Sequence, residues 1–154
     1  MLKGEKRREQ ILAAAEEMFY QNGYERTTVS DIITALGLSK GGFYHHFESK
    51  EALLQAICDR KAEDSYAAAR RAVDDCPGSW ADKFNAMFDQ YGMWQSGNAD
   101  FMGLLIRVAY REDNLIMRDK LKRKSMGLML PLVEEIVKGG VAAQEFITPS
   151  PEGT

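Results

Sequence analysis

Two Ser-Lys pairs, Ser39-Lys40 and Ser49-Lys50, stand where the sequence indicates that a helix begins. Serine favours the N-cap position because its hydroxyl accepts a hydrogen bond from a first-turn N–H group. A lysine just behind that cap meets the positive end of the helix dipole, at a cost of roughly 0.3–1 kcal/mol. Folding alone gives no reason for two such lysines, whereas a polyanion does, since the N–H groups and the ammonium group both attract phosphate. We interpret these pairs as the DNA-facing edge of a helix-turn-helix.

Other side chains that could support catalysis or metal binding are few. The two histidines, His45 and His46, are adjacent, and neighbouring helical residues point roughly 100° apart, so one metal ion is not expected between them. Cys58 and Cys76 fit no zinc-ligand spacing and are too few for a disulfide framework. We find no nucleophile–base pair and no glycine-rich phosphate loop. The sequence therefore predicts no enzyme, no metal site and no cofactor.

The composition is that of a water-soluble protein, and its acidic net charge is compatible with DNA binding through one basic patch. The 154 residues are 45% hydrophobic and 28% charged, and the formal net charge is −3. A locally basic face is compatible with an acidic remainder. The start of the sequence has no apolar segment typical of a signal peptide, and no apolar run reaches the ~18 residues that span a bilayer. We expect a cytoplasmic protein with no membrane partner.

The first third of the sequence predicts three helices. Apolar residues recur at helical spacing from about 5 to 22, and Gly23 is typical of a helix end. Thr28 opens a second helix with a capping box to Asp31, and this helix runs to Leu36. Gly37 supplies a sharp turn, and Ser39 caps a third short helix through about Phe47. Two helices joined by a short glycine-containing turn are typical of a helix-turn-helix.

The remainder also predicts helices and no strand. A long helix is expected over 49–75, followed by helices over 80–94, 99–111 and 114–138. Pro131 should bend the last of these, and Gly139-Gly140 should end it. The fold class is therefore all-α: a three-helix head joined by a long helix to a helical body.

The head resembles a known family. The residues that carry the resemblance are Gly23-Tyr24, Thr27 to Ile32, Gly37 to Phe47 and Ser49 to Leu53. At this spacing they resemble the DNA-binding head of TetR-type (tetracycline-repressor-like, TetR/AcrR) transcriptional regulators, over about the first third of the chain. The resemblance implies a head over 1–48 that binds a palindromic double-stranded DNA operator. It further implies a homodimer and a body over 49–154 that binds a small-molecule effector, which releases the DNA. Most such regulators are repressors.

Carried over residue by residue, the resemblance places seven residues at the DNA: Thr28, Ser39, Lys40, Gly41, Tyr44, His45 and Lys50. Thr28 and Lys50 suit phosphates on either side of the groove, and Lys40 can reach a phosphate or a guanine edge. Tyr44 offers a ring to a thymine methyl group and a hydroxyl to phosphate. Glycine at 41 costs up to ~1 kcal/mol in a helix, which indicates close approach of the backbone to the DNA.

The body offers many large, soft side chains, most of which should form its core. Effector sites are mainly apolar with a few polar groups, and methionine and aromatic linings adapt to bulky ligands. The candidate lining residues are Phe84, Phe88, Tyr91, Met102, Arg107, Tyr110 and Met126. No feature of the sequence identifies the effector.

Two points stay open at this stage. The basic N-terminal residues Lys3, Lys6, Arg7 and Arg8 are either a solvated helix start or a contact to DNA, whereas the basic residues between Arg118 and Lys124 are expected to be a solvated face.

Proteins of this type usually continue with two more helices that form most of the dimer interface. We therefore expect either a shortened body with exposed apolar surface or dimerisation by another surface, such as the helix over 114–138.

The alternative to a regulator is a helical module that binds a small molecule or a protein and has lost productive DNA binding. Salt-dependent binding to generic duplex DNA distinguishes the two, because phosphate contacts impose a steep negative salt dependence.

Overall fold

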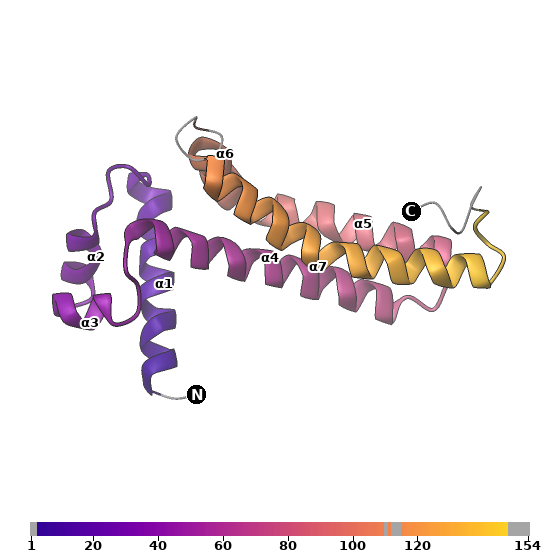
Figure 1. Cartoon of the computed structure of the whole chain (residues 1–154), viewed down its shortest axis with the longest axis horizontal. Helices are drawn as coiled ribbons and strands as arrows, with labels where there is room; N and C mark the ends of the chain where they lie inside the picture. The colour runs from indigo at the N-terminus through magenta and orange to yellow at the C-terminus, as the bar shows by residue number, and fades with distance from the viewer. Residues whose placement is uncertain (1–2, 110, 112–114, 148–154) are drawn as a thin grey trace. The chain divides into compact units, whose positions relative to one another are not determined.

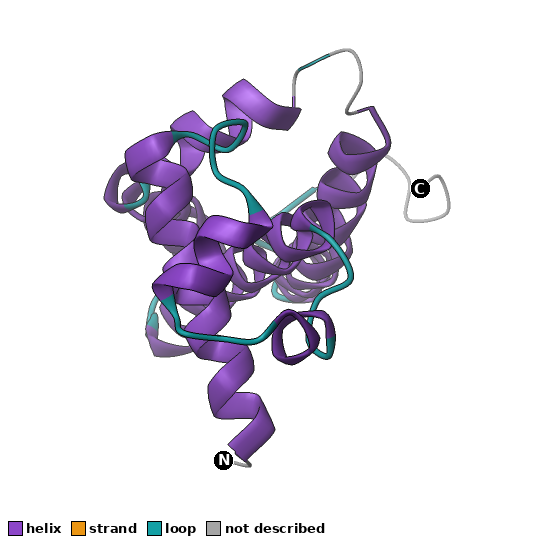
Figure 2. Ribbon diagram, turned by 90° about the vertical axis from the view of Figure 1, so that its left-hand side faces the viewer, coloured by secondary structure: helices purple, strands orange, loops and turns teal. Residues whose placement is uncertain are grey.

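The structure is a computed structural model that describes residues 3–109, 111 and 115–147. Within these residues every regular element is an α-helix, which confirms the all-α fold class (Figures 1 and 2). The helices are α1 (Lys3–Asn22), α2 (Val29–Ala35), α3 (Lys40–Tyr44), α4 (Lys50–Asp75), α5 (Trp80–Gly97), α6 (Ala99–Ala109) and α7 (Leu115–Ala142). None of the described helices combines the length and the apolar character that crossing a membrane requires.

Several helix ends differ from the sequence-based expectation, among them that of α5, which runs to Gly97 rather than to residue 94. α3 stops at Tyr44 rather than Phe47, and the N–H of His45 donates to the carbonyl of Gly41 as the last turn closes. α7 continues through Pro131 and beyond Gly139-Gly140 to Ala142, after which Gln144 takes a left-handed φ of 60°. The two glycines therefore do not end this helix, and their role lies in packing.

The chain divides into two compact units, which we call the head unit (residues 1–61 and 99–121) and the body unit (residues 62–98 and 122–154). Residues 49–61 and 99–121 thus pack with the first 48 residues. The functional division expected after residue 48 stays a prediction.

The head unit is held together by an apolar core under α1, which packs against both α2 and α6. The apolar face of α1 buries Ile11, Leu12 and Phe19 completely or almost so, as its helical spacing predicts. The other buried apolar residues of the head unit are Ala15, Tyr24, Ile32, Phe43, Phe47, Leu53, Leu54, Ile57, Cys58, Phe101, Leu104, Val108 and Ala109. Cys58 is 2% exposed, and burial raises the pKa of its thiol to about 12, so this cysteine is an inert core residue.

The body unit is a packed set of helices formed by the C-terminal part of α4, α5 and most of α7 (Figure 1). Its buried centre consists of Ala69, Val73, Met87, Leu132 and Ile136. At one end of this core, a Cβ atom at Gly139 would collide with the Trp80 ring, and one at Gly140 would collide with the Phe146 ring. Glycine is needed at both positions because two aromatic rings lie directly on the helix backbone.

The carbonyl groups at the C-terminal end of α4 bind the side chain of a lysine. The Lys83 ammonium group donates to the carbonyl oxygens of Val73 and Cys76, each at 2.9 Å, and lies 5.7 Å from the centroid of the Trp80 ring. The last carbonyls of a helix have no partner within the helix, and a cation there also complements the helix dipole. Lys83 thus caps α4 from the following helix.

Candidate nucleic-acid interface

The first helix of the motif is fixed at its start by Thr28. The Thr28 hydroxyl accepts from the N–H of Asp31 at 3.1 Å, and the Asp31 carboxylate accepts from the N–H of Thr28 at 2.8 Å. This is the capping box that the sequence predicts. The hydrogen bonds from the Thr28 backbone and hydroxyl hold the pKa of Asp31 below its ordinary value. Thr28 itself is exposed, immediately before the first residue of α2.

The turn between α2 and α3 depends on Gly37, whose φ of 60° is left-handed. This conformation lets the N–H of Leu38 donate to the carbonyl of Ile33 at 3.0 Å, which closes the end of α2. Ser39 follows in extended conformation, and its hydroxyl accepts from the N–H of Gly42 at 3.0 Å. The predicted helix, turn and capped second helix are all present.

α3 separates a buried side from an exposed side. Phe43 is completely buried, and Phe47, just beyond the helix, is 5% exposed. Lys40, Tyr44 and His45 are exposed, and Tyr44 retains 53% of its accessible surface. In a helix of 3.6 residues per turn, positions 40, 41, 44 and 45 lie within about 140° of arc, away from position 43. α3 and its C-cap residue His45 therefore present one cation, one phenol and one imidazole on one side.

Gly41 lies on this exposed side, and the fold does not require it. A Cβ atom at Gly41 would meet nothing within 4 Å, whereas one at Gly42 would approach the Ser39 hydroxyl at 3.2 Å. Gly42 is thus explained in part by the cap, but Gly41 retains the helix-propensity cost of glycine without a packing reason.

Lys50 has a folding role that the sequence reasoning missed. Its ammonium group donates to the carbonyl of Tyr24 at 3.0 Å and lies 4.2 Å from the centroid of the Tyr24 ring. Lys50 is half-buried, and it fastens the start of α4 to the segment that follows α1. The premise that neither lysine serves the fold is therefore wrong for Lys50. Its phosphate contact stays a prediction. Ser49 caps α4 as expected, accepting from the N–H of Ala52 at 3.0 Å.

A second group missed by the sequence reasoning connects α1 to α4 through Glu16, which is 9% exposed. Its carboxylate accepts from the Tyr20 hydroxyl at 2.7 Å and pairs with the Lys61 ammonium at 2.9 Å and with the Arg60 guanidinium. Burial by itself raises the pKa of Glu16, but the hydrogen bonds from Lys61 and Tyr20 and the two positive charges outweigh it, so the pKa is lowered. The sequence could have indicated this ion-pair group, because a glutamate among the buried apolar residues of α1 requires a positively charged partner.

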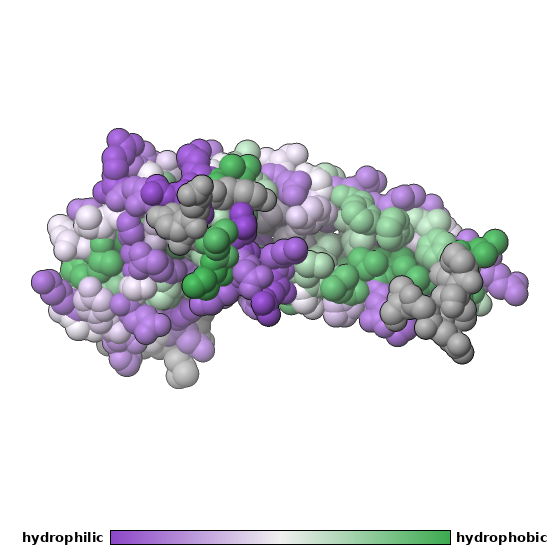
Figure 3. Space-filling model, turned by 45° about the horizontal axis from the view of Figure 1, so that its top comes forward, coloured by the Kyte–Doolittle hydropathy of each residue, from purple (hydrophilic) through white to green (hydrophobic). Residues whose placement is uncertain are grey.

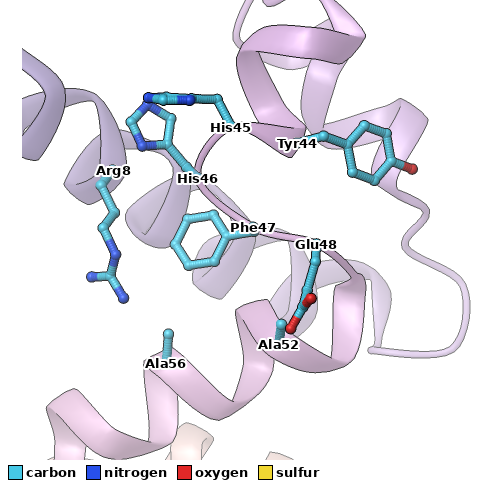
Figure 4. Close-up of a pocket in the computed structure, with 8 residues that line it drawn as sticks. All are labelled: Arg8, Tyr44, His45, His46, Phe47, Glu48, Ala52 and Ala56. Atoms are coloured by element: carbon cyan, nitrogen blue, oxygen red, sulfur yellow. The ribbon is translucent and has the colours of Figure 1, made fainter.

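Beside α3 lies a shallow hollow of 310 Å³ whose wall includes Arg8, His45, His46 and Glu48 (Figure 4). The Arg8 guanidinium lies 5.0 Å from the centroid of the Phe47 ring, and the two imidazole rings are 5.0 Å apart at 73°. His45 is exposed and His46 is half-buried. Among the described residues no three His, Cys, Asp or Glu side chains are placed to hold a metal ion.

The effector candidates are divided between the two units. Met102 and Arg107 belong to the head unit, and Phe84, Phe88, Tyr91 and Met126 belong to the body unit, whereas Tyr110 lies outside the described residues. Phe84 packs against the body core, and its ring lies 4.9 Å from that of Phe88, which is 54% exposed.

The geometry of the head is that of a helix-turn-helix, a motif with which many other proteins bind duplex DNA. Residues 11–57 match the family profile "Bacterial regulatory proteins, tetR family". A 70-residue stretch is 40% identical to the HTH-type transcriptional regulator TtgR of Pseudomonas putida and covers 44% of this chain but 33% of that protein. The aligned part thus spans about a third of this curated relative.

Solved structures extend the likeness to the whole fold. A putative TetR-family transcriptional regulator from Syntrophomonas wolfei superposes with a TM-score of 0.77 at 19% identity, over 97% of this chain and 75% of that one. The regulator FadR from Bacillus subtilis, in complex with stearoyl-CoA, gives 0.71 at 21% identity, over 92% and 74%. These comparisons confirm that residues 11–57 resemble the TetR family in sequence, and that the rest of the chain shares the all-α fold of these structures.

Proposed function

We propose that this protein is a ligand-responsive, DNA-binding transcriptional regulator, in which α3 enters the major groove of an operator. The observation that carries the proposal is the exposed side of α3, where Lys40, Tyr44 and His45 stand around Gly41 while Phe43 anchors the helix from below. The positive charge at the helix start suits phosphate or guanine, and the bare backbone at Gly41 suits close approach. Thr28 and Ser39 supply helix starts for further phosphate contacts.

The regulatory part of the proposal is a repressor that a small-molecule effector releases from a palindromic operator. The effector would stabilise a state in which the two heads of a homodimer no longer match half-sites about 34–36 Å apart. The division into a DNA-binding segment over 1–48 and an effector-binding and dimerising segment over 49–154 belongs to the same proposal. Because the B. subtilis FadR relative is in complex with stearoyl-CoA, compounds with long apolar chains are the first effectors to test.

Self-association is supported by apolar side chains on the surface of the body unit (Figure 3). Met93 is 69% exposed and Leu130 is 54% exposed, and Phe88, Tyr91, Met126 and Val141 add further exposed apolar area in this unit. Exposed apolar surface of this kind is typical of an interaction site. Sedimentation velocity should show a concentration-dependent dimer at micromolar protein, and a clean monomer would contradict the dimeric part of the proposal.

DNA binding is tested by fluorescence anisotropy with a generic duplex over a range of salt concentrations. Wild-type affinity should fall steeply as salt rises, and a Lys40→Ala, Tyr44→Ala double variant should lose most of the binding and reduce the salt slope by about one. The matched control is Lys122→Ala, which removes an exposed lysine of the body unit and should leave both quantities unchanged.

An equal loss in the control would assign binding to the basic residues of α7. Unchanged affinity in the double variant, with an unaltered far-UV circular dichroism spectrum, would favour a helical module without productive DNA binding.

A further inference from the structure

The body unit contains a buried hydroxyl group without a partner. Ser65 is 6% exposed, and among the described residues its Oγ atom is the one buried side-chain oxygen or nitrogen that makes no hydrogen bond. Leaving a buried hydroxyl unpaired destabilises a fold, so such groups are few and call for an explanation. Alanine at this position would avoid that penalty at similar volume.

Ser65 lies on the inward face of α4. It precedes Ala69 and Val73 by four and eight residues, and these two residues are 0% and 1% exposed within the body core. Residues four apart lie above one another on a helix, so the hydroxyl continues the buried stripe by one turn. Its neighbours at three and four positions along this part of α4 include Ala62, Ala68 and Ala69, whose methyl groups offer no hydrogen bond.

Two ion pairs show which part of α7 lies at the level of Ser65. Lys124 pairs with Glu63 at 2.7 Å, and Glu135 pairs with Arg70 at 2.5 Å, so α4 and α7 run in the same direction. Ser65 lies between Glu63 and Arg70 on α4, and the corresponding stretch of α7 between residues 124 and 135 carries Met126 and Met129. Met129 packs against the body core, and Met126 is 45% exposed.

We propose that Ser65 is the polar anchor of the effector site, where its hydroxyl binds one neutral oxygen group of an otherwise apolar molecule. The alanine side chains beside the hydroxyl are small, and the flexible methionine side chains can rearrange over an alkyl chain. We expect an uncharged effector group because Arg70 and Lys124, two of the cations on these parts of α4 and α7, are already paired with carboxylates. The assignment of a regulatory effect to this site rests on the proposed function, but the binding itself does not.

The test uses the full chain without DNA and 1-octanol as the probe, followed by calorimetric titration. Wild type and the control Ser125→Ala, an exposed serine on α7, should bind 1-octanol with equal Kd. Ser65→Ala should bind it about three- to tenfold more weakly, as expected for loss of one hydrogen bond. Octanoate should bind more weakly than 1-octanol to wild type, because its carboxylate would lack a cation.

A second readout separates a ligand anchor from a structural serine. Removing an unpaired buried hydroxyl should raise the thermal unfolding midpoint of the free protein, so Ser65→Ala should unfold at a higher temperature than wild type. A lower midpoint, equal 1-octanol affinity in Ser65→Ala, or no 1-octanol binding by wild type would each overturn the proposal. Because no DNA is present, these outcomes are independent of whether the head binds an operator.

Discussion

Substituting Gly41 by alanine should stabilise the protein while impairing DNA binding. Glycine inside a helix costs about 0.8–1.0 kcal/mol relative to alanine. A Cβ atom at Gly41 would meet nothing within 4 Å, and Gly41 is not among the described glycines with positive φ, so no steric or conformational penalty offsets this gain. Since α3 has five residues, we expect about 0.5–1 kcal/mol of added stability. The unfolding midpoint should then rise by about 1–4 °C.

The DNA affinity of Gly41→Ala should fall by about tenfold or more, because the added methyl group keeps the backbone of α3 away from the duplex. Gly127→Ala is the matched control: Gly127 lies inside α7, and a Cβ atom there also meets nothing within 4 Å. It should give a similar rise in the midpoint and no change in affinity. The two assays are differential scanning fluorimetry and anisotropy with duplex DNA. A stabilised Gly41→Ala protein that binds DNA as tightly as wild type would refute the close-approach reasoning.

Three further predictions concern contacts within the head unit or within the body unit. Glu16→Gln should lower the free energy of unfolding by about 1.5–3 kcal/mol, because it removes the buried carboxylate that pairs with Arg60 and Lys61, although Arg60 keeps its pair with Glu9. The pKa of Glu16 is lowered in the folded protein, so the Glu16 carboxylate contributes its full stabilisation above the ordinary pKa of 4.5. This stabilisation is lost as the pH falls below 4.5 and through the lowered pKa. In urea unfolding, the free energy of unfolding of Glu16→Gln should therefore fall less than that of wild type over this pH range. Gly139→Ala should cost about 1–3 kcal/mol because the new methyl group collides with the Trp80 ring, and a thermal midpoint equal to that of wild type would contradict this packing. Lys83→Met should cost about 1–2 kcal/mol in urea unfolding through two lost hydrogen bonds at the end of α4, and an unchanged midpoint would rule out the cap.

Local signals determine the head well enough to predict it from sequence. The capping box at Thr28 and the caps at Ser39 and Ser49 each depend on residues three positions apart, and the turn at Gly37 requires only one left-handed residue. Such patterns are readable because partner and residue are close in the chain. For the same reason, the exposed side of α3 followed from the spacing of Phe43 and Phe47.

What could not be predicted depends on contacts between residues distant in the chain. Lys50 looked like a surface cation until its partner, the carbonyl of Tyr24, was known. Gly139 resembled a helix end, although it is required by the ring of Trp80 59 positions earlier. In both cases the residue type shows which contacts are possible, and only the folded structure shows which partner makes the contact.

Whether α3 reads duplex DNA can be decided by selecting bound fragments from a pool of random duplexes with the full chain and sequencing them. We expect an enriched inverted repeat whose half-sites are about one helical turn apart, centre to centre. Recovered fragments no more alike than the starting pool, under low-salt conditions where the protein is folded, would contradict it.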